Sequence, residues 1–130
     1  MDPRGALTFL EEDADVPFSI RRIYYIYRVA EGERRGFHAH KRLKQCLICL
    51  GGSCKILLDD GKERQIVELN DPNEGLYIDT PVWREMYDFS AGATLLVLAS
   101  ESYDEADYIR DYDEFIAYVK GSHAYEGSIC

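Results

Sequence analysis

The run Gly36-Phe37-His38-Ala39-His40 lies in a longer stretch, residues 37–50, that is rich in aromatic and apolar side chains. Such residues favour β-strands. Because successive side chains of a strand point to opposite faces, His38 and His40 share one face and Ala39 points to the other. Imidazole exchanges protons near neutral pH, with an ordinary pKa of about 6.5, and is also the commonest metal ligand. This run therefore predicts a strand with either a proton-transfer site or a metal site on one face.

Other runs of strand-forming residues are separated by turn signals along the rest of the chain. They are residues 6–10, 18–29, 54–59, 63–69, 75–78, 83–89 and 94–100. Asp60-Gly61 is typical of a tight hairpin turn, because both residues tolerate the positive φ that such turns require. Since strands do not alternate with helices, we expect an all-β fold of antiparallel strands, either a sandwich or a small barrel.

One short helix is predicted near the end of the chain, over residues 111–120, and Gly121 is expected to end it. Its apolar residues fall on one stripe: Tyr112, Phe115, Ile116 and Val119. The acidic stretch 101–107 is expected to be a solvated connection. With 130 residues the chain is long enough for one domain, which we expect at residues 1–120, followed by a flexible tail at 121–130.

The charge distribution bears on the type of ligand. The net charge of −9 argues against nucleic acid as a partner, because phosphate contacts need a basic face. Residues 21–44, however, carry eight basic residues against two acidic ones. This basic segment around the histidine pair indicates a small anionic ligand, although long basic side chains can also form a solvated strand face.

The cysteines and the start of the chain bear on the compartment. Cys46 and Cys49 are three residues apart, so on a strand they face opposite sides and are not expected to form a metal or redox pair. Free thiols fit a reducing cytoplasm. The N-terminus has no apolar signal core, and no apolar run approaches the roughly 20 residues needed to span a bilayer. We therefore expect a cytoplasmic protein without a membrane partner.

The histidine pair belongs to a pattern that resembles the two motifs of the cupin barrel, or jelly roll. Metal-binding cupins carry two histidines and a glutamate in the first motif and another histidine in the second. Here Gln45 stands at the glutamate position and Arg84 at that of the last histidine. An amide is a poor metal ligand and a guanidinium is none, so proton transfer is favoured over a metal site.

A second strand, within residues 18–29, offers partners for this chemistry. Alternation places Arg22, Tyr24 and Arg28 on one face; alternatively, Tyr24 is an ordinary core aromatic and Arg28 a rim charge. A base that removes a proton from carbon needs a neighbouring carbonyl, and a donor where the oxyanion develops. His38 is the candidate base, and Arg84, Arg28 or Tyr24 the candidate donor.

Five longer runs resemble the sugar 3,4-ketoisomerases, small cupins that act on dTDP-4-keto-6-deoxyglucose in deoxyaminosugar biosynthesis. They are RIYYIY (22–27), ERRGFHAHK (33–41), LLDDG (57–61), VWREM (82–86) and YDEADYIR (103–110). The likeness extends over residues 2–120 and is more specific than the general cupin pattern.

This resemblance implies a reaction without metal or cofactor. His38 would remove the C3 proton, an enediol would form, and C4 would be reprotonated to give the 3-keto sugar. The implied catalytic residues are His38, His40, Tyr24 and Arg28. Those implied to bind substrate are Arg4 and Arg84 at the sugar and Arg34, Arg35 and Lys41 at the diphosphate. Family members differ in the gluco or galacto configuration at C4, for which the surroundings of Arg4 and Arg84 are candidate determinants.

The resemblance also implies a homodimer with exchanged N-terminal strands. Three other classes of protein stay open at this point: a non-catalytic cupin that binds a nucleotide sugar, an epimerase-like sugar cupin, and a metal-dependent oxygenase cupin.

Overall fold

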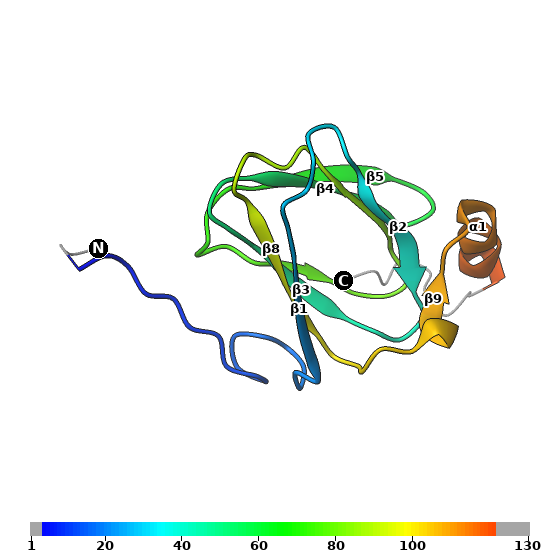
Figure 1. The fold of residues 1–130 in the computed structure, drawn as a ribbon. Helices are drawn as coiled ribbons and strands as arrows, with labels where there is room; N and C mark the ends of the chain where they lie inside the picture. The colour runs from blue at the N-terminus through cyan, green and yellow to red at the C-terminus, as the bar shows by residue number, and fades with distance from the viewer. Residues whose placement is uncertain (1–3, 122–130) are drawn as a thin grey trace.

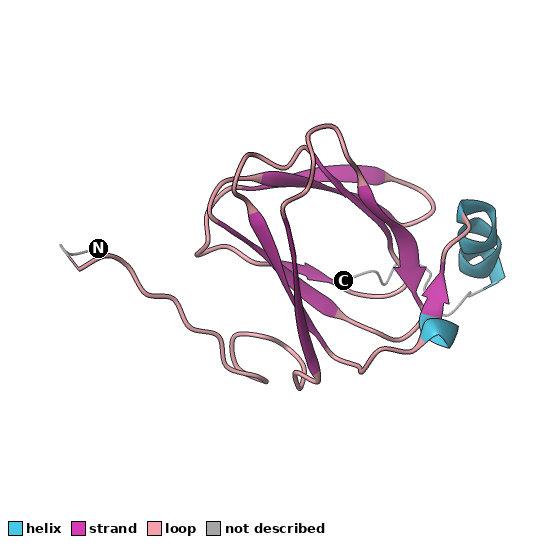
Figure 2. Ribbon diagram, in the orientation of Figure 1, coloured by secondary structure: helices cyan, strands magenta, loops and turns pink. Residues whose placement is uncertain are grey.

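The computed structural model describes residues 4–121 and consists of two antiparallel β-sheets that face each other, with one helix at the side (Figures 1 and 2). The four-stranded sheet has the order β1 (Arg22–Tyr27), β8 (Thr94–Ala99), β3 (Gln45–Leu50) and β6 (Leu76–Ile78). The five-stranded sheet has the order β5 (Arg64–Leu69), β4 (Cys54–Asp59), β7 (Trp83–Tyr87), β2 (Arg35–His40) and β9 (Tyr108–Ile109). The predicted all-β antiparallel architecture is confirmed.

Three segments differ from the prediction. The stretch 37–50 forms two strands, β2 and β3, which a turn at residues 41–44 separates. Residues 6–10 form no strand, because no segment within the described residues 4–121 pairs with them. The stretch 101–107, expected to be solvated, instead ends in the 3₁₀-helix η1 (Glu105–Asp107), and β9 follows it and pairs with β2.

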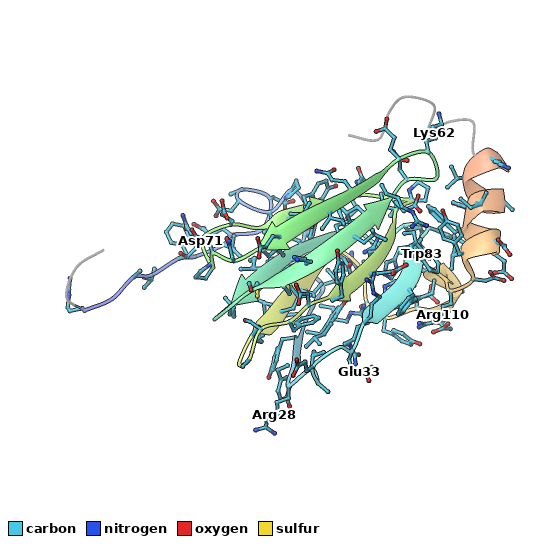
Figure 3. All side chains as sticks on the ribbon, turned by 90° about the horizontal axis from the view of Figure 1, so that it is seen from above. Arg28, Glu33, Lys62, Asp71, Trp83 and Arg110 are labelled. Carbon is cyan, nitrogen blue, oxygen red and sulfur yellow. The ribbon has the colours of Figure 1, made fainter. Side chains whose placement is uncertain are left out.

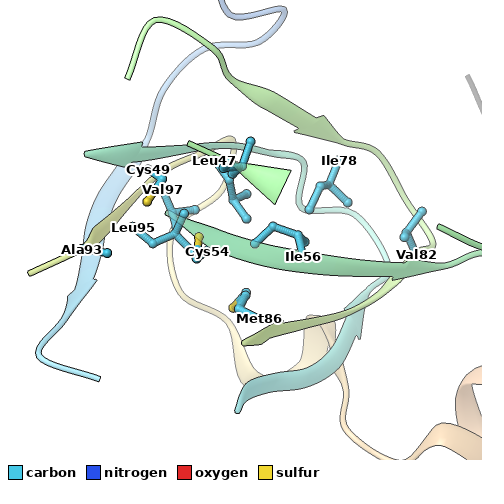
Figure 4. Packing of buried hydrophobic residues seen from close by; sticks show 11 residues of the cluster. Leu47, Cys49, Cys54, Ile56, Ile78, Val82, Met86, Ala93, Leu95 and Val97 are labelled. Atoms are coloured by element: carbon cyan, nitrogen blue, oxygen red, sulfur yellow. The ribbon is translucent and has the colours of Figure 1, made fainter. Parts of the chain in front are cut away.

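Apolar side chains fill the space between the two sheets at the end away from the histidines. Leu47 and Cys49 on β3 meet Ile56 on β4 and Leu95 on β8 (Figure 4). Cys46 belongs to a different cluster, with Val16, on the outer face of the same sheet. The prediction that Cys46 and Cys49 face opposite sides is confirmed, as strand geometry requires.

Helix α1 (Tyr112–Gly121) covers the outer face of the five-stranded sheet. Its buried Phe115 packs with Trp83, Ile109 and Ala39. Ala39 thus points outward to the helix, and its neighbours His38 and His40 point into the barrel. The predicted tail at 121–130 lies outside the described residues, apart from Gly121, which closes α1.

Within residues 4–121, no helix is long and apolar enough to cross a membrane.

Candidate active site

A cavity of about 390 Å³ opens between β1 and β2. Its lining residues are Arg22, Tyr24, Tyr25, Ile26, Arg35, Gly36, His38, Met86, Tyr108 and Arg110. Apart from Ile26 and Met86, its side chains are aromatic, basic or imidazole groups. The cavity therefore suits a ligand that has both a ring and negative charge.

A β-bulge aims His38 into this cavity. The register between β2 and β7 shifts between Gly36 and His38, and Gly36 adopts a positive φ of 96°. A Cβ at this glycine would approach the backbone oxygen of Arg84 to 2.8 Å, so only glycine fits. The Gly36 carbonyl in turn lies 3.1 Å from Nδ1 of His38. Nδ1 must carry the hydrogen of this bond, because a carbonyl only accepts.

The remaining ring nitrogen of His38 is available as a base. Its Nε2 is buried and meets no hydrogen-bond partner among the described residues. Burial first, and the nearby charge of Arg84 second, lower the pKa of His38 to about 4. The ring is thus neutral at pH 7, with a bare Nε2 at the cavity.

His40 lies behind His38 and is fully buried. The two rings meet edge to face, with centroids 4.9 Å apart. Nδ1 of His40 lies 3.2 Å from Oδ2 of Asp107. Burial first, and Arg84 second, lower the pKa of His40 to about 2, so a neutral ring makes this contact as a hydrogen bond and not as an ion pair.

A chain of hydrogen bonds connects the barrel interior to Tyr24. Arg84 is completely buried and donates to the Val82 carbonyl and to Oε1 of Gln45. The Gln45 amide donates to the Tyr24 hydroxyl over 2.8 Å. Burial raises the pKa of Tyr24, so the phenol keeps its proton. Because its oxygen already accepts from Gln45, the Tyr24 O–H is directed to donate elsewhere.

The cavity lining also includes residues that were not among the predicted site residues, notably Arg22, Tyr108 and Arg110. Nε and Nη2 of Arg22 are buried without a partner among residues 4–121, and its guanidinium lies 5.0 Å from the Tyr24 ring centre. Alternation along β1 already places Arg22 on the face of Tyr24. Tyr108 and Arg110 were missed because they follow the acidic stretch 101–107, which was expected to be a solvated connection, and no strand was predicted there.

The structure does not bring all predicted residues together. Arg28 has a positive φ of 57° and projects away from the body of the molecule (Figure 3). The alternation of β1 ends before it, so it points to solvent and not to the cavity. Arg34 pairs with Glu85 at 2.8 Å and stacks on Tyr87, outside the cavity lining.

Most of the other predicted binding residues also lie outside the cavity lining. Lys41 is exposed near the Tyr118 ring. Arg4 is exposed in the N-terminal arm, which extends away from the barrel (Figure 1). Of the five predicted binding residues, only Arg35 lines the cavity, and Arg84 lies buried beside it.

Within residues 4–121, no group of three or more His, Cys, Asp or Glu side chains is placed to hold a metal ion. The two imidazoles have Gln45 and Arg84 where a metal-binding cupin carries ligands, and neither group suits a cation. The reaction without a metal stays a prediction.

Known proteins are similar to this chain in sequence and fold. The family described as "FdtA: WxcM-like, C-terminal" matches residues 1–120. The TDP-4-oxo-6-deoxy-alpha-D-glucose-3,4-oxoisomerase of Aneurinibacillus thermoaerophilus is 52% identical over 119 residues, which are 92% of this chain and 86% of that protein. The chain belongs to the FdtA family.

Solved structures agree. QdtA, a sugar 3,4-ketoisomerase from Thermoanaerobacterium thermosaccharolyticum in complex with TDP, is 55% identical with a TM-score of 0.91, covering 95% of this chain and 90% of QdtA. A 3,4-ketoisomerase from Helicobacter canadensis is 54% identical with a TM-score of 0.89, covering 92% and 90%. The predicted family and enzyme class are confirmed: this FdtA-family chain is a sugar 3,4-ketoisomerase.

Proposed function

We propose that this protein converts TDP-4-keto-6-deoxyglucose into its 3-keto isomer and that His38 is the base. The observation that carries the proposal is the bare, neutral Nε2 of His38 at a cavity lined by basic and aromatic groups. A histidine-to-asparagine variant of QdtA was crystallised with TDP-4-keto-6-deoxyglucose, which supports both the substrate and a role for a histidine.

The chemistry starts at C3 of the sugar. Nε2 of His38 takes the C3 proton, the electron pair of that bond forms the C3=C4 double bond, and the C4 carbonyl oxygen becomes an enolate oxygen. Proton transfer from O3 to O4 and protonation at C4 then give the 3-keto sugar. Base and acid roles near neutral pH suit an imidazole whose other nitrogen is held by Gly36.

The enolate oxygen needs a donor. The Tyr24 hydroxyl and the Arg22 guanidinium both line the cavity beside His38, and Nε and Nη2 of Arg22 have no hydrogen-bond partner among the described residues. A donor aimed at a developing oxyanion is commonly worth about 2–4 kcal/mol of transition-state stabilisation. We assign the sugar end of the cavity to these two residues, and the diphosphate to Arg35 at its open side.

The test is proton exchange at carbon. The protein is incubated with TDP-4-keto-6-deoxyglucose in deuterated water, and NMR follows the label and the configuration at C4. We expect deuterium at C4 and a 3-keto product, with His38→Asn as the matched inactive control. Binding of the nucleotide sugar with neither label nor product would contradict the proposal and indicate a binding protein.

The assembly is proposed to be a homodimer with exchanged N-terminal segments. Leu7 and Phe9 in the extended arm are 85% and 66% exposed, and Tyr25 on the edge strand β1 is 60% exposed. Such apolar exposure on an arm and an edge strand favours cover by a second copy. Light scattering should give twice the chain mass, and removal of residues 1–10 should shift it towards the monomer.

A cytoplasmic location is proposed as well, because Cys46, Cys49 and Cys54 are free thiols, which suit a reducing compartment.

A further inference from the structure

Asp107 is a buried carboxylate that closes η1, and only 2% of its surface is exposed. Its Oδ1 accepts from the backbone N–H of Arg42 at 2.7 Å, and its Oδ2 accepts from that of Leu43 at 3.2 Å. The backbone N–H of Lys41 donates to the backbone carbonyl oxygen of Asp107 at 3.0 Å. These bonds hold the carboxylate rigidly against the turn that follows β2.

The carboxylate also lies 3.9 Å from Nη1 of Arg42 and contacts His40. Oδ2 of Asp107 lies 3.2 Å from Nδ1 of His40. An ionised carboxylate only accepts, so Nδ1 carries the hydrogen of this bond. In a neutral imidazole the other nitrogen is then bare. Nε2 of His40 is buried and meets no hydrogen-bond partner within residues 4–121.

A second bare nitrogen has a use in this reaction, because the reaction makes two proton transfers. The first removes a proton from C3 and delivers one to C4, and the second moves a proton from O3 to O4. Nε2 of His38 serves the carbon-bound proton, and the ring of His40 lies directly behind it. If Nε2 of His40 carried the hydrogen, this buried nitrogen would be a hydrogen-bond donor. Without that hydrogen it is a proton acceptor, the second one beside Nε2 of His38.

We propose that Asp107 is a positioning residue of the isomerase. It accepts from Nδ1 of His40, fixes the tautomer of that ring, and so keeps a second bare imidazole nitrogen beside His38. The inference about catalysis rests on the proposed function, whereas the tautomer is a property of the protein without substrate.

The tautomer is read directly by ¹⁵N NMR of the imidazole nitrogens in the wild-type protein. We expect the hydrogen of His40 on Nδ1, with the signals assigned through His40→Asn. In Asp107→Asn we expect the hydrogen to move to Nε2 in part or completely, because an amide N–H can face Nδ1. A wild-type His40 with its hydrogen on Nε2 would overturn the proposal, whether or not any variant folds.

Kinetics test the consequence. Asp107→Asn should lower kcat by about 10–100-fold, the range typical of residues that orient a functional histidine, and leave KM within about twofold. The matched control is Asp104→Asn, since Asp104 lies in the same segment and also bonds Arg42 but does not touch a histidine. An unchanged kcat in a folded Asp107→Asn protein would overturn the proposal.

A double variant separates positioning from general support of the fold. If Asp107 acts through His40, adding Asp107→Asn to His40→Asn should change kcat by less than about twofold. A further tenfold loss in the double variant would mean that Asp107 acts elsewhere. Absence of isomerase activity in the wild type would refute the proposed function and leave the NMR result on the tautomer standing.

Discussion

The two ends of the barrel interior differ in character although the same strands build them. On β3, Gln45 lies at the end that holds the histidines, and Cys49 lies at the opposite end in the apolar cluster. On β8, the small Ala99 lies opposite Gln45, and the larger Leu95 lies opposite Cys49. The apolar end buries surface and stabilises the fold, whereas the polar end buries imidazole, guanidinium and carboxylate groups that cost free energy and supply chemistry.

The largest expected effect lies at the polar end. His38→Asn should lower kcat by at least about 10³-fold, because a general base acts mainly in the transition state. The affinity for TDP should stay within a few-fold. The measurements are the NMR assay of isomerisation and calorimetry with TDP. Full activity in this variant would move the base to His40 or Tyr24.

The second effect belongs to the apolar end. Leu95 is completely buried in the cluster between the sheets, so Leu95→Ala should lower the free energy of unfolding by about 2–5 kcal/mol. Its kcat at 25 °C should stay within about twofold of the wild type. Ile66→Ala is the matched control, because Ile66 is 58% exposed and should cost little. Urea unfolding measures both, and a large loss of kcat in Leu95→Ala would erase the contrast between the two ends.

The third effect is the cost of the buried histidines in acid. Burial lowers the pKa of His38 to about 4, below the ordinary value of 6.5 that it has in the unfolded chain. Below pH 6.5 the unfolded state therefore binds a proton that the folded state does not, so stability falls as the pH drops towards 4. The expected slope is about 1.4 kcal/mol per pH unit for this histidine.

Urea unfolding between pH 7 and 5 measures this slope in the wild type and in His38→Asn. In the variant, the dependence of the unfolding free energy on pH should be smaller by the contribution of His38, and the contribution of His40 should remain. An unchanged slope would mean that His38 titrates normally in the folded protein. By the same reasoning, kcat/KM should stay flat from pH 7 down to about 5 and decline only near pH 4.

The smallest effect is expected at Arg28. This side chain projects to solvent beyond the cavity, so Arg28→Ala should change kcat/KM by less than about twofold. Its matched control is Arg22→Ala on β1, the strand that precedes Arg28. This change removes a cavity guanidinium whose Nε and Nη2 have no hydrogen-bond partner within residues 4–121, and it should cost about 10²-fold. Steady-state kinetics measure kcat/KM in both variants. Equal losses of kcat/KM would mean that Arg28 takes part in the site.

The sequence was most informative where local geometry suffices. Strand alternation correctly placed Cys46 and Cys49 on opposite faces, and Ala39 opposite the histidines. It failed at Arg28, where a left-handed backbone conformation ends the alternation. It also failed at Asp107, because an acidic run reads as solvated unless a fold is known that buries one of its members.

By itself, the sequence determined the all-β class, the shared face of the two histidines and the family, because period-two alternation and local motifs need only neighbours along the chain. Only the tertiary structure decided which partners complete the site. The pairing of β9 with β2 brings Asp107 to His40 from 67 positions away, and the facing sheets bring Arg22 to His38. Such contacts depend on how distant segments pack, and the spacing of residues along the sequence does not determine this packing.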